Sequence, residues 1–272
     1  LMISESQFDF SDDQYNGLVD IFKFLVGYDN FGFRLSGYAG TGKTTLITEL
    51  VGFLLRRRFI KKVAFSAPTH KAVNIMKAKF KRHLDEILGH KSLFDQLEDL
   101  KSNDLIVEFV TLHKLLGYAG GLDMHGERIF EAKYSPKTCN YDFIIIDESS
   151  MVSLDIVSHF VNLIMKNLEK GDVPPKVLFL GDPAQLPPVN ELVSFLFIDE
   201  KTPINKFNFG HLLNDKIKLD NLEKMKGWLV AQPGHLLKKV VRTDVEKMMN
   251  MWIRIRDWVS GDIDDPHADE FK

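Results

Sequence analysis

The sequence predicts an α/β domain in which a parallel β-sheet is flanked by helices and carries an inserted β-hairpin. Short apolar runs, of the kind buried on both faces of a parallel sheet, alternate with longer segments of helical periodicity. A glycine-rich loop connects the first such run to the helix that follows it. A glycine-containing stretch at residues 117–136 interrupts the alternation and has the pattern of a hairpin. Together these three observations lead to the fold class.

Each element is expected from its own local pattern. Apolar runs predict strands at residues 33–36, 62–66, 105–110, 141–147 and 177–181. Apolar residues at helical spacing predict helices at residues 44–57, 69–88, 154–168, 214–229 and 244–259. The acidic segment 262–272 is expected to be a frayed tail. Because ligands of doubly wound sheets bind at the carboxyl ends of the strands, we expect the functional residues there.

Composition limits the classes of protein to consider. The 272 residues are enough for one large domain or a core domain with insertions. With 44% hydrophobic and 27% charged residues the chain is ordinary for a soluble globular protein, and no apolar run approaches the roughly 20 residues that span a bilayer. The net charge of −3 means that a nucleic-acid site would have to be a local groove. Cys139 is the only cysteine and no signal-peptide pattern is present, which predicts a reducing compartment, cytoplasmic or nuclear.

The glycine-rich loop at residues 37–44 matches G-x-x-x-x-G-K-[ST], the pattern of a loop that wraps a nucleoside triphosphate. Its glycines let backbone N–H groups approach phosphate oxygens. Lys43 is expected to bring positive charge to the β- and γ-phosphates, and Thr44 to offer its hydroxyl to Mg²⁺. An ordinary glycine turn before a helix is the alternative. The predicted ATP-binding residues of the loop are Gly37, Gly40, Thr41, Gly42, Lys43, Thr44 and Thr45.

Two further strand ends carry polar groups suited to phosphate chemistry. Asp147 and Glu148 follow an apolar run, and we expect Asp147 to hold Mg²⁺ and Glu148 to act as the catalytic base. Gln185 lies in the proline-rich loop 181–189, and its amide can both donate and accept hydrogen bonds, which suits a sensor of the γ-phosphate or the attacking water. A solvated acidic pair and a proline-stiffened connection are the respective alternatives.

Polar residues after two other predicted strands point to nucleic acid. Thr69 opens a helix whose N-terminus could contact a phosphodiester, with Lys71 adding charge. Thr111 and His113 are placed similarly after the next strand, although a lone histidine is often structural. Gln14 precedes an apolar helix, and its amide could read the edge of an adenine, although in isolation a surface glutamine is the better interpretation.

With these motifs in this order, the chain resembles superfamily 1 helicases, in the branch that contains RecD-type enzymes and the phage Dda helicase. The loop Gly-Asp-Pro-x-Gln-Leu-Pro-Pro-Val at residues 181–189 is the most discriminating of them. From the first to the last, the matching segments span about two-thirds of the chain. They are Gln14 (Q motif), residues 37–44 (motif I), Pro68, Thr69, His70 and Lys71 within residues 68–73 (motif Ia), residues 111–113, residues 147–151 (motif II) and residues 181–189 (motif III).

The resemblance implies a RecA-like P-loop NTPase domain that uses ATP and Mg²⁺ to drive 5′→3′ movement on single-stranded DNA. Residues 1–116 and 137–260 would form the RecA-like domain 1A. The inserted segment 117–136 is similar to the 1B hairpin of the family, a strand-separating pin, with Met124 and His125 near its tip. A segment similar to motif IV ends at Arg242, whose family counterpart reaches the γ-phosphate.

Motifs V and VI of the family are not found in residues 1–272, so we expect a second RecA-like domain elsewhere in a parent chain. Without that domain, this segment is expected to bind nucleotide weakly and to show little hydrolysis or unwinding. An RNA helicase or translocase of the same superfamily, a non-catalytic nucleic-acid-binding module and a P-loop kinase or loader ATPase remain as alternatives. Intact Lys43, Asp147, Glu148 and Gln185 argue against a non-catalytic module, and motifs Ia and III argue against a kinase.

Overall fold

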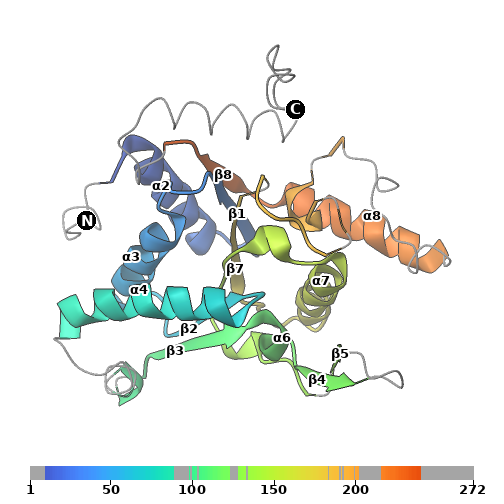
Figure 1. The fold of residues 1–272 in the computed structure, drawn as a ribbon, viewed down its shortest axis with the longest axis horizontal. Helices are drawn as coiled ribbons and strands as arrows, with labels where there is room; N and C mark the ends of the chain where they lie inside the picture. The colour runs from blue at the N-terminus through green and yellow to red at the C-terminus, as the bar shows by residue number, and fades with distance from the viewer. Residues whose placement is uncertain are drawn as a thin grey trace, which may run out of the picture.

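The computed structural model contains a parallel β-sheet with helices on both faces (Figure 1). It describes residues 10–88, 98, 100–102, 104–122, 128–132, 134–182, 184–189, 191, 193–198, 200–201 and 216–239. Within these residues the sheet has six strands in the order β3-β2-β6-β7-β1-β8, and every neighbouring pair is parallel. They are β1 (Gly32–Gly37), β2 (Lys62–Ala67), β3 (Ile106–Thr111), β6 (Phe143–Ile146), β7 (Lys176–Gly181) and β8 (Gly234–Leu237).

Helices connect the strands and cover the sheet. No helix among the residues described is long and apolar enough to cross a membrane. The α-helices are α2 (Asp12–Val26), α3 (Lys43–Arg56), α4 (His70–Leu88), α6 (Leu112–Leu115), α7 (Leu154–Glu169) and α8 (Lys216–Ala231). Short 3₁₀ helices are η1 (Thr138–Asn140), η2 (Ser149–Met151) and η3 (Phe195–Phe197).

The strands are apolar on both faces because each face packs against helices. In β6, Phe143 and Ile145 belong to the core formed with α2, α3 and α4, whereas Ile144 and Ile146 belong to the core formed with α6, α7 and α8. All four of these side chains are buried. This alternation explains why the sequence of the strand is continuously hydrophobic, as expected for a parallel sheet between two helical layers.

The predicted hairpin is confirmed. Strands β4 (Tyr118–Leu122) and β5 (Arg128–Ala132) pair antiparallel as a separate two-stranded sheet, with Gly120 opposite Phe130. A backbone hydrogen bond from the Tyr134 N–H to the Gly117 carbonyl, 3.0 Å long, closes its base. The hairpin leaves the sheet after β3 and α6 and returns before β6 (Figure 1).

Most of the predicted elements are found, with boundaries shifted by one or two residues; one predicted strand is shorter than expected, and one strand was missed. The strand predicted at 141–147 is shorter, since β6 ends at Ile146 and the chain turns at Glu148, which has a left-handed φ of 52° and precedes η2. Strand β8 was not predicted; it is short and pairs with β1 at the edge of the sheet. The predicted helix 244–259 and the tail 262–272 lie outside the described residues.

Candidate nucleotide-binding site

The loop between β1 and α3 has the backbone conformation that its glycines permit. Gly40 and Gly42 have left-handed φ values of 86° and 79°, which side-chain-bearing residues rarely adopt. Gly42 is also the N-cap of α3, so the first turn of this helix begins immediately after the loop. The Thr41 hydroxyl donates a hydrogen bond of 2.9 Å to the Tyr38 carbonyl and fixes the loop from inside. The loop therefore presents the positive end of α3 to the surface above the sheet.

The Lys43 side chain folds back over this loop. Its Nζ donates to the carbonyl oxygens of Gly37, at 2.6 Å, and Tyr38, at 3.0 Å. These bonds hold the ammonium at the mouth of the loop, where phosphate oxygens could replace one or both carbonyls as acceptors. The predicted role of Lys43 is compatible with this position, and in the structure its ammonium bonds to two carbonyls of the loop.

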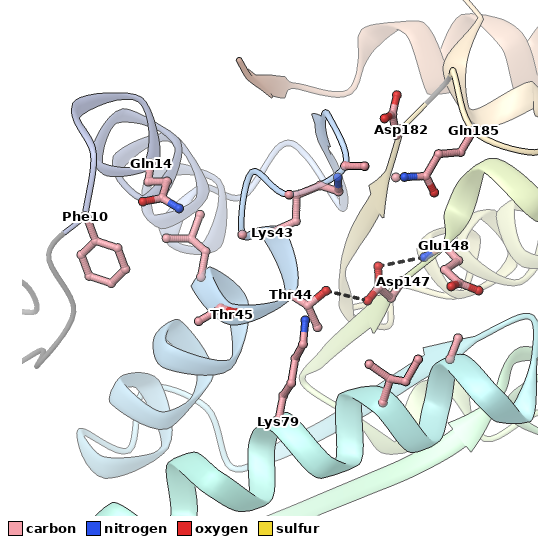
Figure 2. A pocket seen from close by; sticks show the side chains of 17 residues that line it. Phe10, Gln14, Lys43, Thr44, Thr45, Lys79, Asp147, Glu148, Asp182 and Gln185 are labelled. Atoms are coloured by element: carbon pink, nitrogen blue, oxygen red, sulfur yellow. Dashed lines mark hydrogen bonds between the residues drawn. The ribbon is translucent and has the colours of Figure 1, made fainter. Parts of the chain in front are cut away.

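A hydrogen bond joins the two residues predicted to hold a metal ion. The Thr44 hydroxyl, on the first turn of α3, donates to Asp147 Oδ2 over 3.0 Å, and the backbone N–H of Glu148 donates to Asp147 Oδ1 over 2.9 Å (Figure 2). Asp147 directly follows β6, so two parallel strands place these side chains at the same edge of the sheet. The Thr44 hydroxyl and the Asp147 carboxylate are adjacent oxygen ligands of the kind that fit Mg²⁺, which proteins usually hold through one or two oxygens together with phosphates and water.

Glu148 lies beside this pair in an environment that favours its protonated form. Burial raises the pKa of its carboxyl above the ordinary value of 4.5, the negative charge of Asp147 raises the pKa further, and Lys71 acts in the opposite direction. A carboxylate with a raised pKa is a stronger base than an exposed one, which suits a group that polarises water.

Gln14 contacts the phosphate-binding loop from α2. Its Nε2 donates to the Thr41 carbonyl over 3.0 Å, while its Oε1 accepts a 3.1 Å bond from the Ser11 N–H in a capping box. Both ends of the amide are thus bonded within the protein. The remaining amide hydrogen and lone pair leave capacity for a base.

The loop predicted to sense the γ-phosphate begins at the end of β7. Gln185 is exposed on this loop, while Asp182 is buried and its Oδ1 accepts a 3.1 Å bond from the Ala184 N–H. The Ser149 hydroxyl donates to the Leu180 carbonyl over 2.7 Å. This bond ties η2, and with it the Asp147–Glu148 turn, to the strand that carries the loop.

Most of the residues predicted for nucleotide binding and hydrolysis line one pocket with a volume of about 770 Å³ (Figure 2). Of the residues predicted to act in nucleotide binding or hydrolysis, it brings together Gln14, Gly40, Gly42, Lys43, Thr44, Thr45, Asp147, Glu148 and Gln185. Gly37 and Thr41 lie in the same loop but do not line the pocket, and Arg242 lies outside the described residues.

Several residues of the pocket were not predicted from the sequence. Phe10 lines it beside Gln14, at the start of the described chain. Ala72, Ile75 and Lys79 line it from α4, and their spacing of three and four residues is the signal that could have identified them as one helix face. The further members of the lining are Ala39, Leu46, Gly181 and Asp182.

Those residues predicted to contact nucleic acid that the structure describes lie at or just after the carboxyl ends of the adjacent strands β2 and β3. The Thr69 hydroxyl accepts a 3.2 Å bond from the Ala72 N–H, and the Thr111 hydroxyl accepts a 3.5 Å bond from the Lys114 N–H, so both cap the helices that follow. His113 is half-buried against Tyr118, and burial lowers the pKa of its imidazole. The remaining predicted residues are Pro68, His70 and Lys71 at the start of α4, and Met124 and His125, which lie outside the described residues.

Comparison with known proteins agrees with this geometry. The model of the AAA domain family AAA_19 matches residues 30–191. An uncharacterized protein of Acanthamoeba polyphaga mimivirus is 30% identical over 202 residues, which cover 71% of this chain and 36% of that protein. The RecBCD enzyme subunit RecD of Buchnera aphidicola subsp. Schizaphis graminum is 32% identical over 157 residues, which cover 57% of this chain and 23% of RecD. The chain thus spans about a third or less of the length of these relatives.

A solved structure shares the fold. A structure of two coordinating Pif1 helicases that describes DNA unwinding at forked double-stranded DNA superposes with a TM-score of 0.51 at 19% identity, covering 93% of this chain and 49% of the Pif1 chain. The RecD relatives support the predicted resemblance to RecD-type enzymes, and the predicted resemblance to the Dda helicase stays a prediction. The chain therefore belongs to the AAA domain family AAA_19, it has the fold of a RecA-like domain, and it is similar in sequence to the RecBCD enzyme subunit RecD.

Proposed function

We propose that this chain is the ATP-binding and ATP-hydrolysing motor domain of a DNA helicase that moves 5′→3′ along single-stranded DNA. The observation that carries the proposal is the contact between Thr44 and Asp147. It joins the end of the glycine loop to the end of a different strand, inside a pocket that also contains Lys43, Glu148 and Gln185. A glycine turn or a solvated acidic pair would not require these five side chains to converge.

Each group has a separate task in this proposal. Lys43 and the N-terminus of α3 bind the phosphates, and Thr44 and Asp147 hold Mg²⁺, which would neutralise phosphate charge when bound. Glu148 accepts a proton from the attacking water, helped by its raised pKa. Gln185 is exposed on its loop and can follow the γ-phosphate or the water.

Single-stranded DNA would run across the ends of β2 and β3. There Thr69 and Thr111 lie at helix N-termini, where backbone N–H groups favour phosphates, so that binding would be largely independent of sequence. The hairpin β4–β5 follows α6 directly and would meet the duplex as a separating pin. The named relatives support a DNA substrate, because one is a RecBCD subunit and another is a Pif1 helicase studied on forked DNA.

Nucleotide binding is the first test. We expect isothermal titration of the chain with Mg²⁺ and ATPγS to detect binding, and Lys43→Ala to abolish it or weaken it at least about tenfold without changing the circular dichroism spectrum. The matched control is Lys23→Ala, which changes an exposed lysine on α2. Equal affinity of the Lys43→Ala and Lys23→Ala proteins would refute the assignment of the site.

The preference for DNA over RNA and the catalytic role of Glu148 are tested in the full-length protein. We expect oligo-dT to stimulate ATP hydrolysis more than oligo-rU, whereas equal or stronger stimulation by RNA would favour the RNA translocase. We expect Glu148→Gln to retain nucleotide binding and lose hydrolysis. Loss of binding in that variant would instead indicate a metal-holding role for Glu148.

A further inference from the structure

Helix α4 forms one wall of the nucleotide pocket. Ala72, Ile75 and Lys79 line the pocket, and their spacing places them on the same helix face. Lys79 is partly buried there, whereas Lys77, two residues earlier, is exposed and does not line the pocket. Figure 2 shows the Lys79 side chain extending from α4 toward the first turn of α3, where Thr44 lies.

The carboxyl groups in this pocket explain why it would need the ammonium group of Lys79 in addition to that of Lys43. Asp147, Glu148 and Asp182 contribute carboxyl groups to the lining, so the pocket needs positive charge to accept a polyanion. Lys43 contributes one ammonium and already bonds to two carbonyls of its own loop. Lys79 approaches from the opposite wall and from a different element, so it adds positive charge where the loop does not supply it.

We propose that Lys79 is a second phosphate-binding residue of the nucleotide site, contributed by α4. The inference deepens the proposed function and depends on the pocket being a nucleotide site. Figure 2 places the Lys79 side chain below Thr44 and away from Gln185, the predicted sensor of the γ-phosphate. Lys79 therefore holds the phosphates that ATP and ADP share, and it sets the affinity for both nucleotides.

The test compares affinities of the chain for Mg²⁺ with ATPγS, for Mg²⁺ with ADP, and for adenosine. A hydrogen bond to a charged group is worth about a tenfold change in affinity. We therefore expect Lys79→Met to lower the affinities for ATPγS and for ADP about tenfold each and to leave the affinity for adenosine unchanged. Methionine keeps the length and the helix propensity of the side chain. Lys77→Met is the matched control on the same helix and should bind like the unchanged chain. Lys79→Arg retains the charge and should restore most of the affinity.

The outcomes separate this inference from the proposed function. If Lys43→Ala loses binding but Lys79→Met binds all three ligands like Lys77→Met, the inference is wrong and the nucleotide site stands. If neither Lys43→Ala nor Lys79→Met changes affinity, both proposals fail. A loss confined to ATPγS would place Lys79 at the γ-phosphate and overturn the assignment to the shared phosphates. An equal loss for adenosine, or a loss that Lys79→Arg does not restore, would show a packing role and also overturn the inference.

Discussion

Asp13 links the first turn of α2 to the end of β8. Its Oδ2 accepts hydrogen bonds from the backbone N–H groups of Lys238, at 2.6 Å, and Lys239, at 3.1 Å. His235 lies alongside, with Nε2 3.6 Å from Asp13 Oδ1 and Nδ1 2.9 Å from Asp20 Oδ2. Since β8 lies at the edge of the sheet and pairs only with β1 among the described strands, the Asp13 side chain is a main attachment of the two residues that follow β8.

We expect Asp13→Ala to lower the free energy of unfolding by about 1–2 kcal/mol. Hydrogen bonds to a charged acceptor are worth about 1.5–3 kcal/mol, and partial exposure of this carboxylate lets water replace part of the loss. The Asp13 side chain has a relative exposure of 27%, so we place the combined free energy of its two hydrogen bonds toward the lower end of that range. In a chain of this size 1 kcal/mol corresponds to about 2 °C, so the melting temperature should fall by about 2–4 °C.

Asp12→Ala is the matched control, because Asp12 is exposed in the same helical turn. Both substitutions remove a negative charge near the N-terminus of α2, which is worth about 0.3–1 kcal/mol, so the difference between them measures the bonds to β8. We also expect hydrogen exchange of the Lys238 and Lys239 amides to accelerate in Asp13→Ala and not in Asp12→Ala. Equal melting temperatures and equal exchange rates would refute the attachment.

Three further predictions concern packing and charge. A Cβ at Gly181 would lie 2.5 Å from Phe197 Cζ and 2.8 Å from Ser149 Oγ, so we expect Gly181→Ala to lower the free energy of unfolding in urea by about 1–3 kcal/mol. Gly227 in α8 has no such neighbour within 4 Å, and Gly227→Ala should raise that free energy by about 0.5–1 kcal/mol; a loss there would contradict the helix assignment. Because the pKa of Glu148 is raised by folding, the carboxyl stabilises the fold below its ordinary value of 4.5 and loses that contribution as the pH rises through the folded-state pKa. Glu148→Gln should therefore be more stable than the unchanged protein at pH 7, with the gain vanishing below about pH 4.5; a gain that is equal at both pH values would contradict the burial argument.

The fold was predictable where local pattern and topology agree. The strand of Phe143 to Ile146 is apolar at every position, and only a strand covered on both faces accommodates that pattern. Once the sheet is parallel, the carboxyl ends of its strands share an edge, so the proximity of Thr44 and Asp147 follows from sequence order and strand direction. The roles of these residues in catalysis stay predictions.

The remaining part of the site depends on tertiary packing that no local pattern encodes. Lys79 enters the pocket because α4 packs against α3 with one particular face, and the sequence offers several lysines on that helix. Strand β8 has four residues, and only its pairing with β1 distinguishes it from a loop. The turn at Glu148 shortens β6 through a left-handed backbone that is uncommon for this residue type.

Gln14 shows why a motif residue need not have a single role. The motif predicts that its amide reads a base, yet in the structure the amide caps α2 through Ser11 and braces the loop through the Thr41 carbonyl. Loss of the brace would loosen the loop for every nucleotide, whereas loss of base reading would weaken only nucleotides with the preferred base. A substitution at Gln14 that weakens ATP and GTP equally therefore reports on the loop, and only a change in the ratio of the two affinities reports on the base.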